Sequence, residues 1–197
     1  MDANRGIWVG DGGNFVVNGP AAVGPHAHAH AHAEVTVTAR REPPSGALPT
    51  RRVFLSYRRE DADGHAGRLY DDLVQRFAPD CVFIDVDGIA PGENFADRIT
   101  TVIARSDTVL VLIGRSWLEA STADGRRRLD DTDDWVRIEV ETALRLDLTV
   151  VPVLVGGAPM PAAGRLPPSM RELALRQAAT IGPSWHDDVE RLVAAIA

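Results

Sequence analysis

From residue 52 onward, apolar residues follow two alternating patterns along the chain. One pattern is a short continuous apolar run, which predicts a strand. The almost wholly apolar run TVLVLIG (108–114) is typical of a parallel strand that is covered on both faces. The other pattern spaces apolar residues three or four positions apart, which predicts amphipathic helices. The predicted strands are 52–57, 81–85, 108–114, 149–155 and 178–182, and the predicted helices are 65–77, 94–106, 134–146, 169–175 and 187–197.

The alternation of five strands with helices predicts an α/β fold with a parallel sheet and right-handed crossovers. We expect a flavodoxin-like sheet of strand order 2-1-3-4-5, flanked by helices. In such sheets the ligand crevice lies beyond the carboxyl ends of the strands, beside strands one and three. The helix positions expected to face the core are Leu69, Leu73, Val74 and Phe77, then Phe95, Ile99, Val102 and Ile103, and finally Val136, Val140, Ala143 and Leu144.

The composition of the chain changes near residue 50. Residues 1–50 are rich in Gly, Ala, Pro and His, so we expect a flexible tail there and a folded domain over 51–197. Within 6–24, the β-prone runs IWV and NFVVN could stack, amyloid-like, on a matching motif in a partner protein. The alternative is a disordered tail. The tail also contains alternating histidines, His26, His28, His30 and His32. They could bind a transition metal weakly, but the alternation also suggests repeat expansion, and we expect no metal role.

Charge and residue types narrow the classes of function. The formal net charge of −7 argues against a general nucleic-acid binder. All 21 basic residues are arginine, which excludes lysine-dependent chemistry such as Schiff bases or a Walker A motif. No apolar run approaches the roughly 18 residues of a membrane span, no export signal is recognisable, and the single Cys81 cannot form an intrachain disulfide. We therefore expect a cytoplasmic protein that binds neither nucleic acid nor membrane.

Three polar segments adjoin the elements that should meet at the crevice. FLSYRRED (54–61) leaves the first strand, DVDGIAPGEN (85–94) leaves the second, and DWVRIE (134–139) opens the third helix. The segment 85–94 is longer than the roughly two to six residues usual for a loop between strand and helix, which favours a functional role. Taken singly, the three segments are also consistent with a solvated arginine pair, a surface loop and a solvated glutamate on a helix flank.

In combination, these segments resemble the TIR (Toll/interleukin-1 receptor) domain in order and spacing, over residues 51–197. The resemblance rests on FLSYRRED, on the long loop FIDVDGIAPGENF, on SDTVLVLIGRSW, on the W-x-x-x-E helix DDWVRIEVETAL and on VVPVLV. It is closest to the bacterial TIR domains and the axon-degeneration TIR enzyme, which cleave NAD+.

The resemblance implies roles for individual residues of this chain. Glu139 corresponds to the catalytic glutamate, with NAD+ as the substrate and with no cofactor and no metal. Arginine suits the diphosphate because its fork matches phosphate oxygens, and a carboxylate can stabilise the oxocarbenium-like centre formed when the nicotinamide–ribose bond breaks. The implied substrate contacts are Ser56, Arg58, Arg59, Phe95 and Trp135, and the implied self-association loop contains Asp87, Gly88, Ile89, Pro91 and Gly92.

The leading hypothesis is an NAD+ glycohydrolase that releases nicotinamide and leaves ADP-ribose or a cyclic ADP-ribose. It would act as an immune effector whose activity depends on association with other TIR domains. One alternative is a non-catalytic TIR–TIR interaction module in which Glu139 is incidental, and another is an enzyme that makes a cyclic messenger for a separate effector.

The segment 119–134 departs from the family pattern. There we expect Arg126–Arg128 to be a solvated run that balances Asp130–Asp134, with contact to phosphate or a partner as the alternative.

Overall fold

The computed structural model of the chain describes residues 48–84 and 95–197. The chain divides into two units, Met1–Ser45 and Gly46–Ala197, and every described element belongs to the second unit. The proposed stacking segment 6–24 and the predicted loop 85–94 lie outside the described residues.

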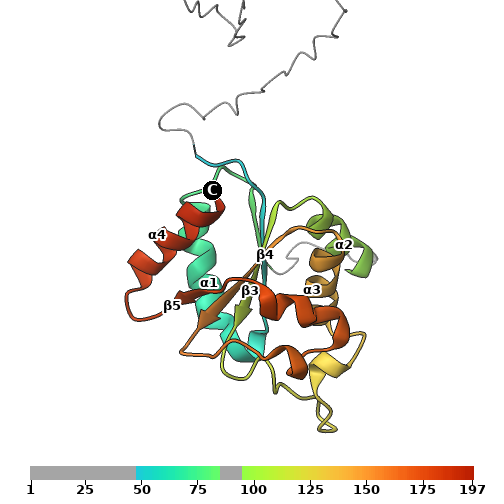
Figure 1. Cartoon of the computed structure of the whole chain (residues 1–197). Coiled ribbons are helices and arrows are strands. Elements are labelled where there is room, and N and C mark those ends of the chain that lie inside the picture. The colour runs from blue at the N-terminus through green and yellow to red at the C-terminus, as the bar shows by residue number, and fades with distance from the viewer. Residues whose placement is uncertain (1–47, 85–94) are drawn as a thin grey trace, which may run out of the picture. The chain divides into compact units, whose positions relative to one another are not determined.

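The described unit is built on a five-stranded parallel sheet of order β2-β1-β3-β4-β5 (Figure 1). This confirms the flavodoxin-like topology predicted from the alternation of patterns. At the centre, β3 pairs with β1 on one side and with β4 on the other. The strands are β1 (Val53–Ser56), β2 (Val82–Ile84), β3 (Thr108–Ile113), β4 (Thr149–Val155) and β5 (Ala179–Ile181).

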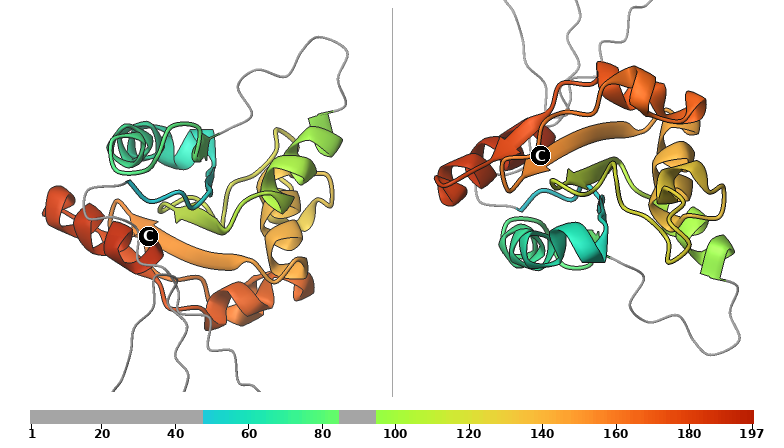
Figure 2. Two further views of the ribbon diagram at one scale, coloured as in Figure 1. Left: turned by 90° about the horizontal axis from the view of Figure 1, so that it is seen from above. Right: turned by 90° about the horizontal axis from the view of Figure 1, so that it is seen from below.

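Helices cover both faces of this sheet (Figure 2). Because side chains alternate along a strand, Val53 and Leu55 of β1 pack into the layer beneath α1 and α4, whereas Phe54 packs into the layer beneath α2 and α3. The α-helices are α1 (Arg59–Val74), α2 (Phe95–Ala104), α3 (Trp135–Arg145) and α4 (Trp185–Ile196), and the 3-10 helices are η1 (Arg128–Asp130), η2 (Ala163–Arg165) and η3 (Pro168–Leu175). Among the described residues, no helix combines the length and the apolar character that a membrane span requires.

Where the structure describes their side chains, the predicted core faces are largely confirmed, with one exception in α1; the side chain of Phe95 lies outside that part of the chain. The side chains of Leu69, Leu73 and Phe77 are fully buried, but Val74 is exposed. Successive helical residues are rotated by about 100° (3.6 residues per turn), so Val74 lies well off the stripe that Leu69 and Leu73 define. In α3 the predicted stripe is buried as expected: Val136, Val140, Ala143 and Leu144.

Candidate active site

A cavity of about 400 Å³ opens at the carboxyl end of β1, where the first strand and the third meet. This is the switch point at which ligands bind in open α/β sheets, and the volume falls within the roughly 300–1,000 Å³ of small-molecule sites. Three segments supply its walls. The lining residues are Tyr57, Arg58, Arg59 and Glu60 after β1, then Thr122, Arg128, Asp131 and Asp133 of the β3–α3 connection, and finally Asp134, Trp135, Val136 and Glu139 at the start of α3.

The cavity brings together most of the predicted site residues that the structure describes. Arg58, Arg59, Trp135 and Glu139 line it, and Ser56 contacts Glu139 directly. Phe95 begins α2, but its side chain lies outside the described part of the chain. The predicted self-association residues also lie outside the described residues: Asp87, Gly88, Ile89, Pro91 and Gly92.

Glu139 is a buried carboxylate on the inner side of α3, with only 7% of its surface exposed. It adjoins Val140, which packs against the sheet, so the helix carries the carboxylate towards the end of β1. There the fully buried Ser56 hydroxyl donates a hydrogen bond of 2.6 Å to Oε2 of Glu139. This length is typical of a hydroxyl bonded to a carboxylate (about 2.5–2.7 Å), and such a donor offsets the cost of burying the acid.

Arg58 forms a bidentate ion pair with Asp134 rather than pointing freely into the cavity. Its Nη1 and Nη2 atoms each donate a 2.9 Å hydrogen bond to the Asp134 carboxylate. Only 2% of the Arg58 side chain and 7% of the Asp134 side chain are exposed. In this conformation, the arginine that the family resemblance assigns to the substrate is bound to a protein carboxylate.

Trp135 is the exposed neighbour of this buried pair. It is the first residue of α3, and 42% of its surface is exposed although it lines the cavity. Trp135 and Glu139 lie one helical turn apart, so both can face a ligand in the same cavity. The arrangement therefore offers an aromatic surface beside a buried carboxylate.

The cavity wall mixes charges of both signs. Arg58, Arg59 and Arg128 line it together with five carboxylate side chains. Arg128 reaches across from the β3–α3 connection and donates a 2.9 Å hydrogen bond to Glu60, and both partners are at least one-third exposed. A substrate anion could exchange with Glu60 as the partner of Arg128, because an exposed pair of this kind contributes little to stability. The five carboxylates are Glu60, Asp131, Asp133, Asp134 and Glu139.

The β3–α3 connection differs from the balanced charge run expected from its sequence. Arg126 pairs with Asp124 and Arg127 with Asp130, whereas Asp134 pairs with Arg58. The expectation that Arg126–Arg128 balance Asp130–Asp134 is therefore confirmed for Arg127 and Asp130, but it is wrong for Arg126, Arg128 and Asp134, whose ion-pair partners lie outside these two runs. Arg127 lowers the pKa of the Asp130 carboxyl, mainly by donating a hydrogen bond to it.

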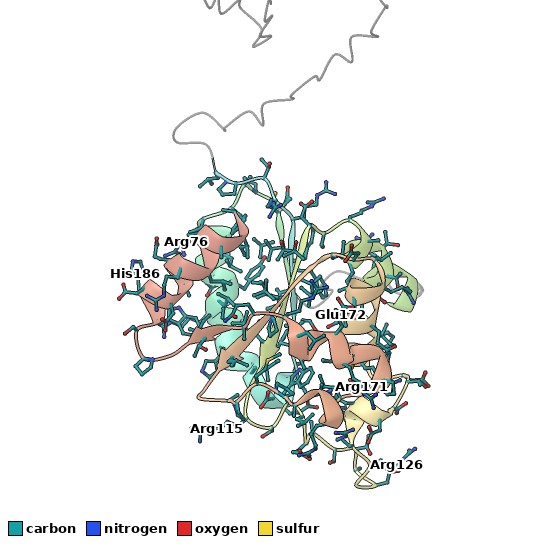
Figure 3. The ribbon with its side chains drawn as sticks, viewed as in Figure 1. Arg76, Arg115, Arg126, Arg171, Glu172 and His186 are labelled. Carbon is teal, nitrogen blue, oxygen red and sulfur yellow. The ribbon has the colours of Figure 1, made fainter. Side chains whose placement is uncertain are left out.

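The same connection is fixed to the body of the domain. Leu129 is fully buried, and the guanidinium of Arg137 donates hydrogen bonds to the backbone oxygens of Leu129 and Asp130. Arg127 also donates to the backbone oxygen of Arg165 in η2. These contacts hold Arg128 at the cavity, while Arg126 lies at the outer end of the connection (Figure 3).

Asp61 joins the start of α1 to the end of β3. Its carboxylate accepts hydrogen bonds of 2.8 Å from the backbone N–H of Gly114 and 2.7 Å from that of Ser116. A Cβ atom at Gly114 would lie 2.4 Å from Oδ2 of Asp61, so the close approach of the two segments requires glycine there. The carboxyl ends of β1 and β3 are thereby held in a fixed arrangement beneath the cavity.

Sequence reasoning did not single out Asp134 as a residue of this cavity, and it gave contact of Arg128 with phosphate only as an alternative. An aspartate directly before an amphipathic run is a common N-cap, and Asp134 indeed accepts a 3.1 Å hydrogen bond from the backbone N–H of Arg137. That signal predicts the cap but not the partner, because Arg58 is 76 positions away. Among the described residues, no group of three or more His, Cys, Asp or Glu side chains is arranged to hold a metal ion.

Comparisons with known proteins agree with this architecture. The chain is 30% identical over 125 residues to the "NAD(+) hydrolase sarm1" of Drosophila melanogaster; the match covers 62% of this chain and spans 8% of that relative. It also resembles the TIR domains in the structure of the activated Roq1 resistosome, with a TM-score of 0.54, 16% identity and coverage of 75% of this chain and 97% of that one. The latter likeness concerns the fold alone. A model of the TIR domain matches residues 53–193, and the chain therefore belongs to the TIR domain family.

Proposed function

We propose that this chain is an NAD+ glycohydrolase that cleaves the bond between nicotinamide and ribose. The observation that carries the proposal is the buried Glu139 carboxylate, which Ser56 holds by a 2.6 Å hydrogen bond in the wall of a cavity beside Trp135. The 30% identity to an NAD(+) hydrolase supports the same reaction, although the chain spans only 8% of that relative.

The proposed reaction converts NAD+ and water into nicotinamide, ADP-ribose and a proton. The C–N bond to the positively charged pyridinium breaks, its electron pair stays with nicotinamide, and nicotinamide leaves as a neutral base without needing a general acid. Positive charge then develops on the ribose, and a preorganised carboxylate nearby lowers the energy of that state. If a nitrogen atom of the adenine attacks in place of water, the product is a cyclic ADP-ribose. NAD+ is consumed as a substrate, and no cofactor is proposed.

The other cavity residues suit the remaining parts of the substrate. The exposed indole of Trp135 can stack against the nicotinamide ring, one helical turn from Glu139. Arg59 and Arg128 line the same cavity and are the arginines assigned to the diphosphate, because both are at least partly exposed, whereas Arg58 is almost fully buried in its ion pair with Asp134. The diphosphate therefore lies between the start of α1 and the β3–α3 connection in the proposed complex.

We further propose that the activity depends on association with other TIR domains and serves an immune signalling role. This part rests on the family resemblance of loop 85–94, which lies outside the described residues. A specific activity that rises with protein concentration, and that falls when Asp87 and Gly88 are substituted, would support dependence on association. A specific activity that is constant from dilute to concentrated protein would contradict it.

Chromatography of NAD+ incubated with the full chain tests the proposed reaction. Glu139→Gln keeps an acceptor for the Ser56 hydroxyl but removes the charge, so we expect nicotinamide release to fall at least about 100-fold. Glu172→Gln is the matched control, because Glu172 lies on η3, pairs with Arg176 and does not line the cavity (Figure 3). This control should retain wild-type activity.

The same experiment separates the alternatives. If concentrated wild-type protein releases no nicotinamide, the result contradicts the proposed reaction and favours the non-catalytic TIR–TIR interaction module. Nicotinamide release with a cyclic product would instead indicate synthesis of a messenger. Equal activity of Glu139→Gln and wild type would remove Glu139 from the proposed mechanism.

A further inference from the structure

Two contacts connect the end of β1 to the start of α3. Ser56, the last residue of β1, bonds to Glu139, and two positions later Arg58 bonds to Asp134. Asp134 and Glu139 are the N-cap and the fifth residue of the same helix. The helix is therefore fixed at two points, just over one turn apart, and Trp135 lies between them.

The Arg58–Asp134 pair has a geometry that sets orientation as well as distance. A bidentate guanidinium–carboxylate contact keeps both planar groups in one plane, which a single hydrogen bond does not. The Asp134 carboxylate also accepts the N–H of Arg137, so the same group fixes the first turn of the helix. The guanidinium thus determines where the axis of α3 begins relative to β1.

Stability alone is a poor explanation for so buried a pair. The desolvation of two charges offsets much of their attraction, and apolar residues of similar volume often do as well. Arg58 Nε, moreover, is buried and has no hydrogen-bond partner in the described part of the chain. A costly and incompletely satisfied pair at the edge of a cavity is better explained by the position that it imposes on its neighbours.

We infer that Asp134 is a positioning residue: through its ion pair with Arg58 it fixes the first turn of α3, and so holds Trp135 and Glu139 in their arrangement around the substrate. This inference rests on the proposed NAD+ cleavage for its catalytic meaning. In the proposed complex, Asp134 does not contact the substrate, and Arg58 positions the helix rather than binding the diphosphate.

The variant Asp134→Asn isolates the ion pair from the cap. Asparagine caps helices about as well as aspartate, so the bond to Arg137 can persist while the charge opposite Arg58 is lost. We expect kcat for nicotinamide release to fall about 10- to 100-fold, because a displacement of about 1 Å at reacting groups can cost about 100-fold. KM should change by less than about 3-fold, because the interaction lost is not one with the substrate.

Asp147→Asn is the matched control at the other end of α3. Asp147 is exposed, does not line the cavity and has a φ of 53°, which asparagine tolerates well. It makes the same chemical change next to the same helix and should leave kcat and KM at wild-type values. An Asp134→Asn enzyme with wild-type kcat, or with a raised KM and unchanged kcat, would overturn the inference, the latter by pointing to contact with the substrate.

A second measurement does not depend on activity. Amide hydrogen exchange over residues 136–140 should quicken at least about 10-fold in both Asp134→Asn and Arg58→Met, with exchange in α4 unchanged. In the double variant the effect should be no larger than in either single variant, because the two residues act as one unit. If wild-type protein releases no nicotinamide, the proposed function fails, while this exchange experiment still supports or refutes the positioning of α3. Unchanged exchange in the single variants would refute it.

Discussion

Ser56 Oγ donates a 2.6 Å hydrogen bond to Glu139 Oε2, although the two residues are 83 positions apart in the chain. Both are buried, and each lies on an element that contributes apolar side chains to the core. The carboxylate at the centre of the proposed reaction is therefore fixed by the sheet itself, rather than by a surface loop. Parallel strands whose carboxyl ends meet at one edge make this possible.

The first prediction concerns that bond. Ser56→Ala removes the hydroxyl that donates to the Glu139 carboxylate, and we expect the free energy of unfolding to fall by about 1–3 kcal/mol. The kcat for nicotinamide release should fall about 10-fold, because the carboxylate is no longer held in one orientation. Chemical denaturation and steady-state kinetics on the same preparations provide both measurements.

Ser106→Ala is the control for this substitution. Ser106 is also buried, but its hydroxyl donates to the backbone oxygen of Val102, and neither residue lines the cavity. It should lose a similar amount of stability and retain kcat. An equal loss of activity in the two variants would show that stability, rather than the Ser56–Glu139 contact, determines the rate.

A second prediction concerns the junction of α1 and β3. Gly114→Ala would place a methyl group 2.4 Å from Oδ2 of Asp61, and the carboxylate could move only by giving up its bonds to Gly114 and Ser116. We expect the free energy of unfolding to fall by about 2–4 kcal/mol, measured by denaturation. Gly67→Ala in α1 is the contrasting case, since no heavy atom lies within 4 Å of the added methyl; there we expect a gain of about 1 kcal/mol.

The third prediction is a pH dependence of stability that involves Asp72 and Trp185. Burial raises the pKa of Asp72, but hydrogen bonds from Trp185 and Arg76 and the charges of Arg76 and Arg68 outweigh it, so the pKa lies below 3.8. The indole N–H donates to the Asp72 carboxylate at 2.7 Å. Because the pKa is depressed in the folded state, the stabilisation is fully present above about pH 4 and is lost as the pH falls through the folded-state pKa.

Trp185→Phe tests this relationship, because phenylalanine keeps an aromatic ring, although a smaller one, and removes the N–H donor. The variant should be less stable than wild type by about 1 kcal/mol at pH 6, and this difference should shrink below about pH 4 as Asp72 becomes protonated. Denaturation curves between pH 7 and pH 2 measure it. In an Asp72→Asn background the pH dependence of the difference should disappear; its persistence there would assign the effect to another group.

Much of the fold could be predicted because its signals are local. The apolar run of β3 and the helical stripe of α3 are consequences of periodicity within one segment, and both are confirmed. Val74 shows where this reasoning fails. Its roughly helical spacing predicts a place in the core. However, Val74 is rotated by about 100° from Leu73 about the helix axis, and its side chain is exposed.

For the site, the sequence predicts which segments take part but not which side chains contact one another. Of the three polar segments, 54–61 and 134–139 meet at the carboxyl end of β1 as expected, whereas 85–94 lies outside the described residues. The sequence does not show which charged group pairs with which. Asp134 lies in an acidic run and could have served Arg126, Arg127 or Arg128; instead it bonds to Arg58, which lies 76 positions away. That choice depends on the packing of α3 against β1, which is a property of the assembled sheet.

The last prediction compares two arginines of the β3–α3 connection. Arg128 lines the cavity and pairs with Glu60, whereas Arg126 pairs with Asp124 outside the cavity lining. Arg128→Gln should raise KM for NAD+ about 10-fold with little change in kcat, because it removes a charge-assisted contact to the diphosphate that exists before and during bond cleavage. Arg126→Gln should change neither constant, and Glu60→Gln should lower KM by releasing Arg128 from its competing carboxylate. A KM that is equally raised in Arg126→Gln and Arg128→Gln would reduce the effect to general electrostatic attraction, and an unchanged KM in Arg128→Gln would remove this residue from the diphosphate site.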